Sequence, residues 1–323
     1  MTESGRDAHA DMRVLFWGTP EFALPALRAI EDGGHEVAGV VTRPDRPRGR
    51  GRKPAPSPVR RYAESRGHRV LTPERPRDGA FVDLVREVAP DISAVVAYGH
   101  ILTRELLEAP RLGSVNVHAS LLPALRGAAP VNWAVARGHT HTGVTVMRMV
   151  EAMDAGPVLA RSELPIGEND TAALLTPRLA ELGAALLADT LARLAAGPVE
   201  EVEQDHAAAT YAPKVSRATA RIDWTRDARE VACLIRGMDA VPGAWSVLRG
   251  QPVKLFAPET VEGDSGRGFD PGHVVSADPR GGLVVAAGAG AVRIGEVQPA
   301  GRRRMEAAAW ILGRGPRAGD RFE

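Results

Sequence analysis

The chain has 323 residues, of which 44% are hydrophobic and 25% charged, and this composition is typical of a globular protein large enough for two domains. A formal net charge of only +1 excludes nucleic-acid binding by the surface as a whole, so such binding needs a local patch. The single cysteine, Cys233, excludes an intramolecular disulfide, and the absence of an apolar run of about 18 residues predicts no membrane span.

Residues 1–11 are polar and lack the apolar centre of a signal peptide, so we predict a disordered tail. Met12 directly precedes the first apolar run, and translation can begin there. These features predict a cytoplasmic protein.

Residues 12–200 alternate between strand-like apolar runs and stretches of helical spacing. The alternation predicts an α/β domain with a mostly parallel sheet and helices on both faces. We expect helices at 20–34, 79–90 and 171–197, strands at 13–18, 35–42, 68–72, 91–99 and 114–120, and an edge hairpin from strands at 142–150 and 156–166.

The second half of the chain has a different texture. Residues 201–217 are polar and irregular, which indicates a linker. Residues 218–323 contain one helical stretch, at 226–237, and then short β-type runs separated by Gly, Pro and Asp. This pattern predicts a smaller β-rich domain, a barrel or a sandwich.

Two polar residues lie in the alternating run SVNVHAS. Asn116 and His118 are two apart, so in a strand they project from the same face, near the carboxyl edge where open parallel sheets bind ligands. An amide donor and an imidazole can together stabilise an oxyanion and move a proton. From spacing alone, a buried and hydrogen-bonded structural pair is the favoured interpretation.

Asp154 follows in the stretch VEAMDAGPVL. A carboxylate on this predicted turn could orient His118 and stabilise its protonated form. An ordinary turn residue remains an alternative, because the sequence does not establish contact with His118.

The segment from Arg43 to Arg61 has eight basic residues, one acidic residue, five Pro and two Gly. We predict a mobile basic loop that contacts phosphates, or alternatively a solvated loop without function. The predicted phosphate contacts are Arg46, Arg48, Arg50, Arg52 and Lys53. Further basic residues, at Lys214, Arg217, Arg221 and 302–304, could line the same nucleic-acid surface.

Two other patterns predict no cofactor. GTPEF at 18–22 lacks the G-x-G-x-x-G spacing of a dinucleotide site, and His139 and His141 have no neighbouring ligand partners. We expect no metal.

Several longer motifs carry a resemblance over nearly the whole chain. FWGTPEFA, VTRPDRPRGRGRKPAPSPV, VVAYGHIL, NVHASLLPALRGAAP, TGVTVMRM with MDAG, ARIDW and GQPVK resemble the methionyl-tRNA formyltransferase family. The resemblance implies a Rossmann-like catalytic domain over 12–200 and an oligonucleotide-binding-like, tRNA-binding barrel over 218–323. It implies 10-formyltetrahydrofolate as donor, initiator methionyl-tRNA as acceptor and a role in translation initiation. A small protein with two ligand-binding domains can work as a monomer, and we expect a monomer here.

The same resemblance implies roles for individual residues. Asn116, His118 and Asp154 would be the catalytic trio, and the 43–61 segment would meet the tRNA acceptor arm. The residues implied for the folate site are Ser120, Leu121, Leu122, Pro123, Tyr98 and Gly99. Two alternatives stay open: a formyltransferase acting on a small amine, such as an amino sugar or glycinamide ribonucleotide, and a non-enzymatic RNA-binding protein.

Overall fold

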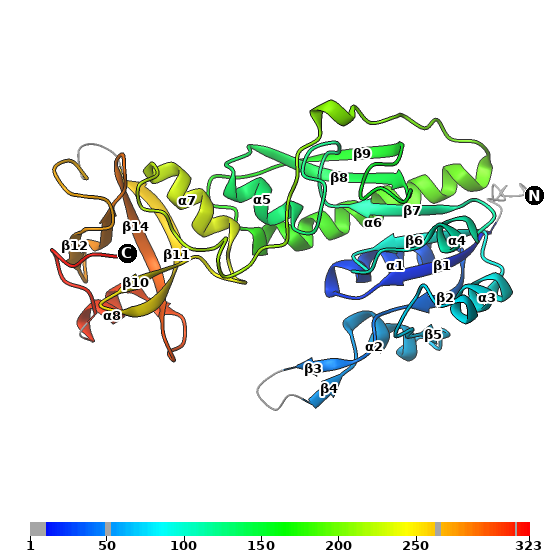
Figure 1. The fold of residues 1–323 in the computed structure, drawn as a ribbon, viewed down its shortest axis with the longest axis horizontal. Helices are drawn as coiled ribbons and strands as arrows, with labels where there is room; N and C mark the ends of the chain where they lie inside the picture. The colour runs from blue at the N-terminus through cyan, green and yellow to red at the C-terminus, as the bar shows by residue number, and fades with distance from the viewer. Residues whose placement is uncertain (1–10, 49–52, 262–265, 314) are drawn as a thin grey trace, which may run out of the picture. The chain divides into compact units, whose positions relative to one another are not determined.

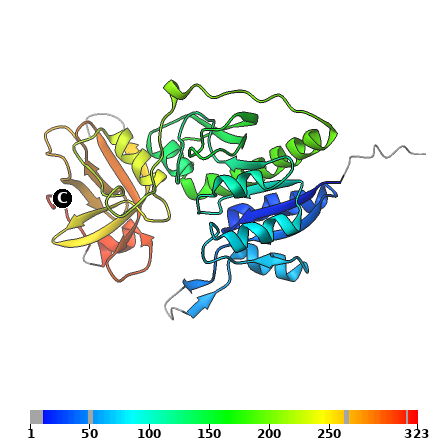
Figure 2. The ribbon, with the colours of Figure 1, turned by 45° about the vertical axis from the view of Figure 1, so that its right-hand side comes forward.

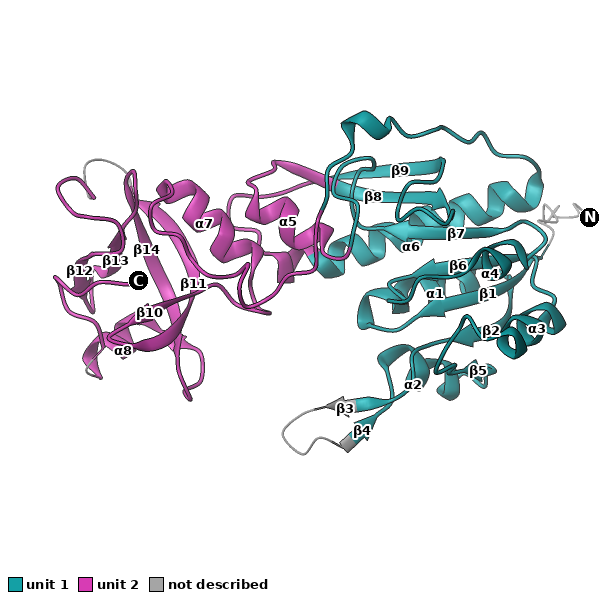
Figure 3. Cartoon of the chain, viewed as in Figure 1, with its two compact units in different colours: residues 1–127, 143–164, 176–211 teal, residues 128–142, 165–175, 212–323 magenta. Residues whose placement is uncertain are grey.

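The computed structural model describes residues 11–48, 53–261, 266–313 and 315–323. The chain divides into two compact units (Figure 3). Unit 1 comprises residues 1–127, 143–164 and 176–211, and unit 2 comprises residues 128–142, 165–175 and 212–323. Across these ranges the structure contains no helix with the length and apolar character needed to cross a membrane.

Unit 1 is built on a seven-stranded sheet (Figure 1). The order of its strands is β5-β2-β1-β6-β7-β8-β9, in which β5, β2, β1, β6 and β7 pair in parallel and β8 is antiparallel to β7. This is the strand order of a Rossmann-like fold, which confirms the predicted mostly parallel sheet. The bounds are β1 Arg13–Gly18, β2 Glu36–Val41, β5 Val70–Leu71, β6 Ile92–Val96, β7 Ser114–His118, β8 His141–Arg148 and β9 Val158–Pro165.

Helices cover the two faces of this sheet. Leu15, Trp17 and Val95 share a buried cluster with apolar residues of α3 and α4. Asn116 pairs in register with Val95, so it projects toward the same face. Val117 projects to the opposite face, where a Cβ atom on Gly183 of α6 would lie 2.8 Å from its side chain. The helices are α1 Leu24–Asp32, α2 Pro58–Ser65, α3 Gly79–Val88, α4 Arg104–Glu108 and α6 Ala172–Ala196, and η1 Glu21–Ala23 and η2 His206–Ala208 are 3-10 turns.

The basic segment 43–61 differs in part from the predicted loop. β3, Arg46–Arg48, pairs with β4, Lys53–Ala55, in a two-stranded antiparallel hairpin, with Arg46 opposite Ala55. The hairpin projects away from the sheet of unit 1 in two views (Figure 1, Figure 2). Backbone pairing needs no apolar surface, which explains how so polar a segment forms strands. Arg50 and Arg52 lie outside the described residues.

Unit 2 contains the predicted β-rich half. Its antiparallel strands follow the order β10-β11-β14-β13-β12, with β15 beside β14. The bounds are β10 Trp245–Leu248, β11 Gln251–Val261, β12 Val274–Asp278, β13 Gly282–Ala286, β14 Ala291–Pro299 and β15 Met305–Glu306, with helices α5 Pro130–Ala136, α7 Ala228–Gly237 and α8 Ala307–Leu312.

The C-terminal residues connect the two edges of this sheet. Phe322 bridges to Leu248 at the end of β10, and Arg321 bridges to His273 just before β12. The Glu323 N–H donates to the Val247 carbonyl at 2.9 Å, and the Val274 N–H donates to the Asp320 carbonyl at 2.7 Å. Because one segment pairs with both edge strands, the sheet closes into a barrel, as the sequence predicts.

The segment predicted as a linker makes specific contacts in unit 1 over its first half. Val202 pairs with Val158 at the start of β9, and Tyr211 forms a bridge with Arg126. Gln204 is only 5% exposed. Residues 201–211 therefore pack as part of unit 1, and the polar character that indicates a linker here serves buried hydrogen bonds.

We expect the Phe322→Ala substitution to lower the free energy of unfolding of unit 2 by about 3–5 kcal/mol. The ring is 1% exposed, lies in the barrel core, and its centroid is 5.8 Å from that of Trp224. Urea denaturation followed by tryptophan fluorescence measures the change. Phe269→Ala is the matched control, because that ring is 44% exposed; equal losses for the two variants would contradict closure by the C-terminal segment.

Candidate active site

The predicted pair Asn116 and His118 lies on β7, in the interior of the sheet of unit 1. Asn116 is opposite Val95 of β6 and Met147 of β8, and His118 is opposite Thr145 of β8. Asn116 is half-buried, and its amide makes no hydrogen bond to any residue that the structure describes. The pair therefore presents an unengaged amide beside an imidazole at the carboxyl end of the strand.

The hydrogen bonds of His118 determine which ring nitrogen carries a proton. His118 is 6% exposed, and its Nε2 lies 3.0 Å from the carbonyl oxygen of Leu125. A carbonyl oxygen only accepts, so Nε2 must be the donor. The second nitrogen, Nδ1, lies 3.7 Å from Asp154 Oδ1. Nδ1 is therefore the basic nitrogen of the neutral ring, and it faces a carboxylate.

Asp154 is held beside His118 by hydrogen bonds and by an uncommon backbone conformation. Its φ is +52°, in the left-handed region that non-glycine residues rarely adopt and that costs on the order of 1–3 kcal/mol. The Gly127 N–H donates to its Oδ2 at 2.7 Å. The structure thus brings Asp154 to His118, a contact that the sequence alone left open.

A residue that the sequence analysis did not identify fixes the Asp154 turn. Gln204 Nε2 donates to the carbonyl oxygens of Asp154, at 3.0 Å, and Gly156, at 2.7 Å. Its Oε1 accepts from Arg126, at 2.6 Å from Nη2 and 3.2 Å from Nε. The amide oxygen therefore faces donors and the amide nitrogen faces acceptors. A side chain turned by 180° about its terminal bond would lose these hydrogen bonds.

Arg126 is an unusual group to find buried. It is 5% exposed, and in the described ranges no carboxylate lies within ion-pair distance of its guanidinium. Its partners are Gln204 and the Nδ1 of His206, which lies 3.0 Å from Nη2. A buried charge needs such partners because desolvation is costly. Arg126 and Gly127 are adjacent, so one short stretch of chain supports Asp154 both directly and through Gln204.

The loop 119–127 carries the residues predicted for the folate site. Ser120 is buried, and its hydroxyl donates to the Ala124 carbonyl at 2.6 Å. The Thr145 hydroxyl donates to the Ser120 carbonyl at 2.7 Å and accepts from the Leu122 N–H at 3.1 Å. Leu122 is 1% exposed, whereas Leu121 and Pro123 are half-buried. Leu121 and Pro123 are thus the larger apolar side chains of this loop that remain partly exposed.

The other two predicted folate residues follow β6. The Tyr98 ring is 2% exposed and packs edge-on against Trp17 at 5.2 Å, so its side chain belongs to the core. Burial raises the pKa of its hydroxyl to about 12. Only its carbonyl faces a neighbouring strand end, where the Thr19 hydroxyl donates to it at 3.1 Å. A Cβ atom on Gly99 would lie 3.2 Å from Arg43 Nη1, so the glycine admits this cation to the strand end.

The acidic residue of the basic segment is already paired. Asp45 lies 3.1 Å from the Arg60 guanidinium, which also contacts Glu64 at 2.7 Å. Arg46 in β3 is exposed. The hairpin therefore offers cationic charge without a competing carboxylate from its own segment.

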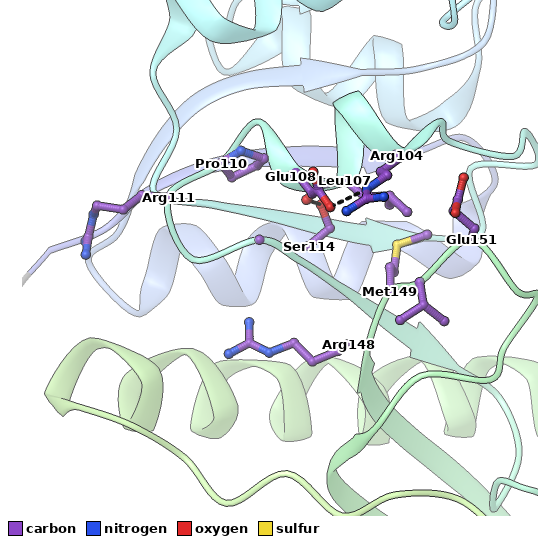
Figure 4. A pocket seen from close by; sticks show the side chains of 11 residues that line it. Arg104, Leu107, Glu108, Pro110, Arg111, Ser114, Arg148, Met149 and Glu151 are labelled. Carbon is purple, nitrogen blue, oxygen red and sulfur yellow. Dashed lines mark hydrogen bonds and ion pairs between the residues drawn. The ribbon is translucent and has the colours of Figure 1, made fainter.

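A separate cavity of about 430 Å³ lies at the other end of β7 (Figure 4). Ser114, the first residue of β7, is among its lining residues, and His118, the last residue of the strand, is not. Its arginines are compensated: Arg104 contacts Glu108 at 2.7 Å, Arg148 contacts Glu201 at 2.7 Å and Arg111 contacts Asp91 at 2.9 Å. Each arginine of this cavity thus already has a carboxylate partner.

The arrangement around His118 suits acyl transfer chemically. Asn116 offers an amide donor to an oxyanion, and His118 offers Nδ1 as a base next to a carboxylate. Over the part of the chain described, no cluster of three or more His, Cys, Asp and Glu residues could hold a metal ion.

Comparison with protein families identifies the class of this fold and site. The formyl transferase model matches residues 12–191, and the formyl transferase C-terminal domain model matches residues 214–315. The chain therefore belongs to the formyl transferase family.

Curated relatives narrow the family further, since the similar proteins are named methionyl-tRNA formyltransferase. The relative from Phenylobacterium zucineum is 48% identical, with 95% of this chain and 99% of the relative covered. Those from Aromatoleum aromaticum and Bacillus licheniformis are 45% and 42% identical, with 97% and 95% of this chain and 98% and 96% of the relatives covered. These similarities confirm the resemblance found in the sequence.

Solved structures share the fold at lower identity. WlaRD, a sugar 3N-formyl transferase in the presence of dTDP and 5-N-formyl-THF, has a TM-score of 0.67 at 15% identity, covering 90% of this chain and 99% of that one. HypX from Aquifex aeolicus in complex with tetrahydrofolic acid has a TM-score of 0.64 at 20% identity, covering 95% and 49%.

We expect Gln204→Leu to lower the free energy of unfolding of unit 1 by about 3 kcal/mol or more. The substitution keeps the approximate side-chain volume but leaves the Arg126 guanidinium and two carbonyls short of partners, and each unsatisfied buried group costs about 1–3 kcal/mol. Urea denaturation measures the loss. Gln251→Leu, at an exposed position, is the control. A loss no larger than that of the control would show that Gln204 does not support the turn.

Proposed function

We propose that this chain transfers the formyl group of 10-formyltetrahydrofolate to the α-amino group of methionine on initiator tRNA, a step of translation initiation. The observation that carries the proposal is the approach of His118 Nδ1 to Asp154 Oδ1, at 3.7 Å, beside the unengaged amide of Asn116. The relatives named methionyl-tRNA formyltransferase, at 40–48% identity over about 95% of the chain, support the choice of acceptor.

We assign the chemical roles as follows. The amine attacks the formyl carbon and a C–N bond forms, while the carbonyl oxygen becomes an oxyanion that accepts a hydrogen bond from Asn116. The attacking amine loses its proton to His118 Nδ1, and Asp154 stabilises the resulting imidazolium. Collapse of the intermediate breaks the bond to the folate N10, which takes up the proton. The Nε2–H bond to the Leu125 carbonyl persists throughout, so proton transfer uses the side of the ring that faces Asp154.

The loop 119–127 is our candidate for the folate site. Leu121 and Pro123 offer apolar surface, and the loop is immobilised by the Thr145 hydroxyl and by the Leu125 N–H, which donates to the Thr210 hydroxyl at 2.9 Å. A pre-formed, largely apolar wall with fixed backbone groups fits a flat heteroaromatic ring. Tyr98 and Gly99 would contribute backbone rather than side chains.

The β3–β4 hairpin is our candidate contact for the tRNA acceptor arm. We assign Arg46, Arg48, Arg50, Arg52 and Lys53 to phosphates, because a cation-rich segment whose carboxylate is already paired attracts a polyanion.

A small amine is the competing acceptor. The sugar formyl transferases with solved structures share the fold at 15–20% identity, far below the identity to the relatives named for methionyl-tRNA. The basic hairpin also carries more cations than the phosphate of a small nucleotide acceptor requires, which favours a polyanion. We further propose that the enzyme acts as a monomer in the cytoplasm, where its acceptor is made.

Transfer of labelled formyl from 10-formyltetrahydrofolate, offered methionyl-tRNA, glycinamide ribonucleotide and a 4-amino sugar nucleotide in parallel, tests the proposal. We expect label on the tRNA alone. Asn116→Ala and His118→Ala should each lower turnover by about 10²-fold or more, whereas the exposed His141→Ala should not. Label on a small amine would reassign the acceptor, and tRNA binding without any transfer would favour a non-enzymatic protein.

Neutralising Arg48, Arg50 and Arg52 to Gln should weaken tRNA binding and reduce the slope of log K against log salt by about 2–3, roughly 0.7–0.9 for each lost phosphate contact. Fluorescence anisotropy with labelled tRNA over a salt series measures the slope. Arg86→Gln is the control, because Arg86 is paired with Asp83 at 3.0 Å. An unchanged slope in the triple variant would show that these three arginines do not contact tRNA phosphates.

A further inference from the structure

A second cavity, of about 470 Å³, lies wholly within unit 2 and has a cationic lining. Arg217, Lys254 and Arg302 line it together with Trp245 and Gln298, and its other lining residues are Pro, Gly and Ala. None of the residues that line it is acidic, whereas three other cavities in unit 2 each include Asp or Glu.

The three cations stand apart from the carboxylates of the described ranges. Among the residues that the structure describes, no carboxylate lies within ion-pair distance of Arg217, Lys254 or Arg302. Arg304, two residues further along, shows the contrast, since it contacts Asp239 at 2.9 Å and Glu296 at 2.6 Å. Ion pairing is therefore available in this part of the barrel, and the cavity lacks it.

Two glycines shape the cavity around its cations. Gly243 has φ +82°, and a Cβ atom there would lie 2.7 Å from Lys254 Cδ, so the lysine stem lies directly over the glycine. Gly301, with φ +71°, precedes Arg302 in a turn in which the Arg302 N–H donates to the Pro299 carbonyl at 3.0 Å. Gln298 Nε2 donates to the Arg302 carbonyl at 3.2 Å and fixes the same turn.

Trp245 supplies a flat aromatic surface in this lining. Its indole N–H donates to the Arg217 carbonyl at 2.6 Å, which orients the ring. The Arg217 guanidinium carbon lies 4.5 Å from the ring centroid, and that of Arg221 lies at 5.6 Å. Nucleic-acid bases stack on aromatic rings and on arginine planes. The stack of Arg217 and Trp245 therefore combines a planar surface with positive charge.

We propose that this cavity binds one nucleotide of the tRNA, with its base against the Arg217–Trp245 stack and its phosphate on Lys254 and Arg302. The chemistry of the lining selects a ligand that is both planar and anionic, and a nucleotide has both properties. The inference rests on the proposed function for the identity of the RNA. It adds a defined nucleotide subsite in unit 2, separate in sequence from the β3–β4 hairpin.

Anisotropy with labelled, uncharged initiator tRNA and no folate tests the phosphate contacts on the full chain. We expect Lys254→Gln/Arg302→Gln to lower affinity and to reduce the salt slope by about 1 to 2. Arg293→Gln is the matched control, because this arginine of the same barrel is paired with Glu259 at 3.2 Å. A double variant with the slope and affinity of the control would overturn the proposal.

Substitution of Trp245 tests the stacking contact. We expect Trp245→Leu to weaken tRNA binding by about tenfold at fixed salt without changing the slope, and Trp245→Phe to restore most of the affinity. Equal affinity of the unmodified chain, Trp245→Leu and Trp245→Phe would show that no base stacks on Trp245. Binding is measured without formyl transfer, so failure of the subsite and failure of the proposed reaction can be told apart. If the variants bind tRNA more weakly but the unmodified chain does not formylate methionyl-tRNA, the subsite is retained and the proposed reaction is overturned. If the unmodified chain formylates methionyl-tRNA but the variants bind tRNA normally, the proposed reaction is retained and the subsite is overturned.

Discussion

The side-chain amide of Gln204 is the interaction on which the geometry of the active site depends. It accepts from a buried arginine and donates to two carbonyls of the Asp154 turn. A buried guanidinium without a carboxylate is stable only when dipoles satisfy its donors, and a residue at φ +52° persists only when its surroundings hold it there. The Gln204 amide contributes to both, together with His206 on the arginine and the Gly127 N–H on the carboxylate. Loss of the Gln204 amide would therefore leave the Arg126 guanidinium short of a partner and would loosen the Asp154 turn at the same time.

This constraint reaches His118 through the carboxylate. The turn sets Asp154 Oδ1 at 3.7 Å from Nδ1, while the Leu125 carbonyl accepts a hydrogen bond from Nε2–H. The carbonyl fixes one proton on Nε2, and the carboxylate lies where a second proton, on Nδ1, would be stabilised. An imidazole held this way needs no reorientation when it accepts a proton, because the new N–H already points toward a carboxylate. The fixed loop 119–127 supplies both the Leu125 carbonyl and the Gly127 N–H, so the loop proposed as the folate wall also positions His118 and Asp154.

The sequence predicted most of what depends on local periodicity. The first strand, at 13–18, and the shared face of Asn116 and His118 follow from patterns of period two. The contact of Asp154 with His118 was only a hypothesis, because no local pattern encodes an approach between residues so distant along the chain. Gln204 was missed altogether, since polar composition at 201–217 is the same for a solvated linker and for a segment whose polar groups are buried and bonded.

Two other features show the same limit. The basic segment 43–61 was predicted as a loop, because its composition lacks the apolar alternation of a buried strand, yet its backbone pairs as a hairpin. The barrel was one of two architectures that short strands allowed. Closure depends on residues 319–323, whose hydrogen bonds to both edge strands leave no trace in hydrophobic patterning.

A net charge of +1, from 41 basic and 40 acidic residues, makes the distribution of ion pairs decisive for a polyanionic substrate. Arginines that lie beside carboxylates, such as Arg60, Arg148 and Arg304, contribute little to the field that an RNA meets. Among the described cations without a carboxylate within ion-pair distance are Arg46 of the hairpin in unit 1 and the three cations of the Trp245 cavity in unit 2. Each alone is a modest site, and screening at physiological salt confines each to its own surroundings. An RNA that reaches both gains from their covalent linkage, because binding at one raises the effective concentration at the other. A small acceptor such as glycinamide ribonucleotide carries phosphate for one such contact but lacks the many phosphates of an RNA, so on the proposed assignments the two sites together would favour the RNA.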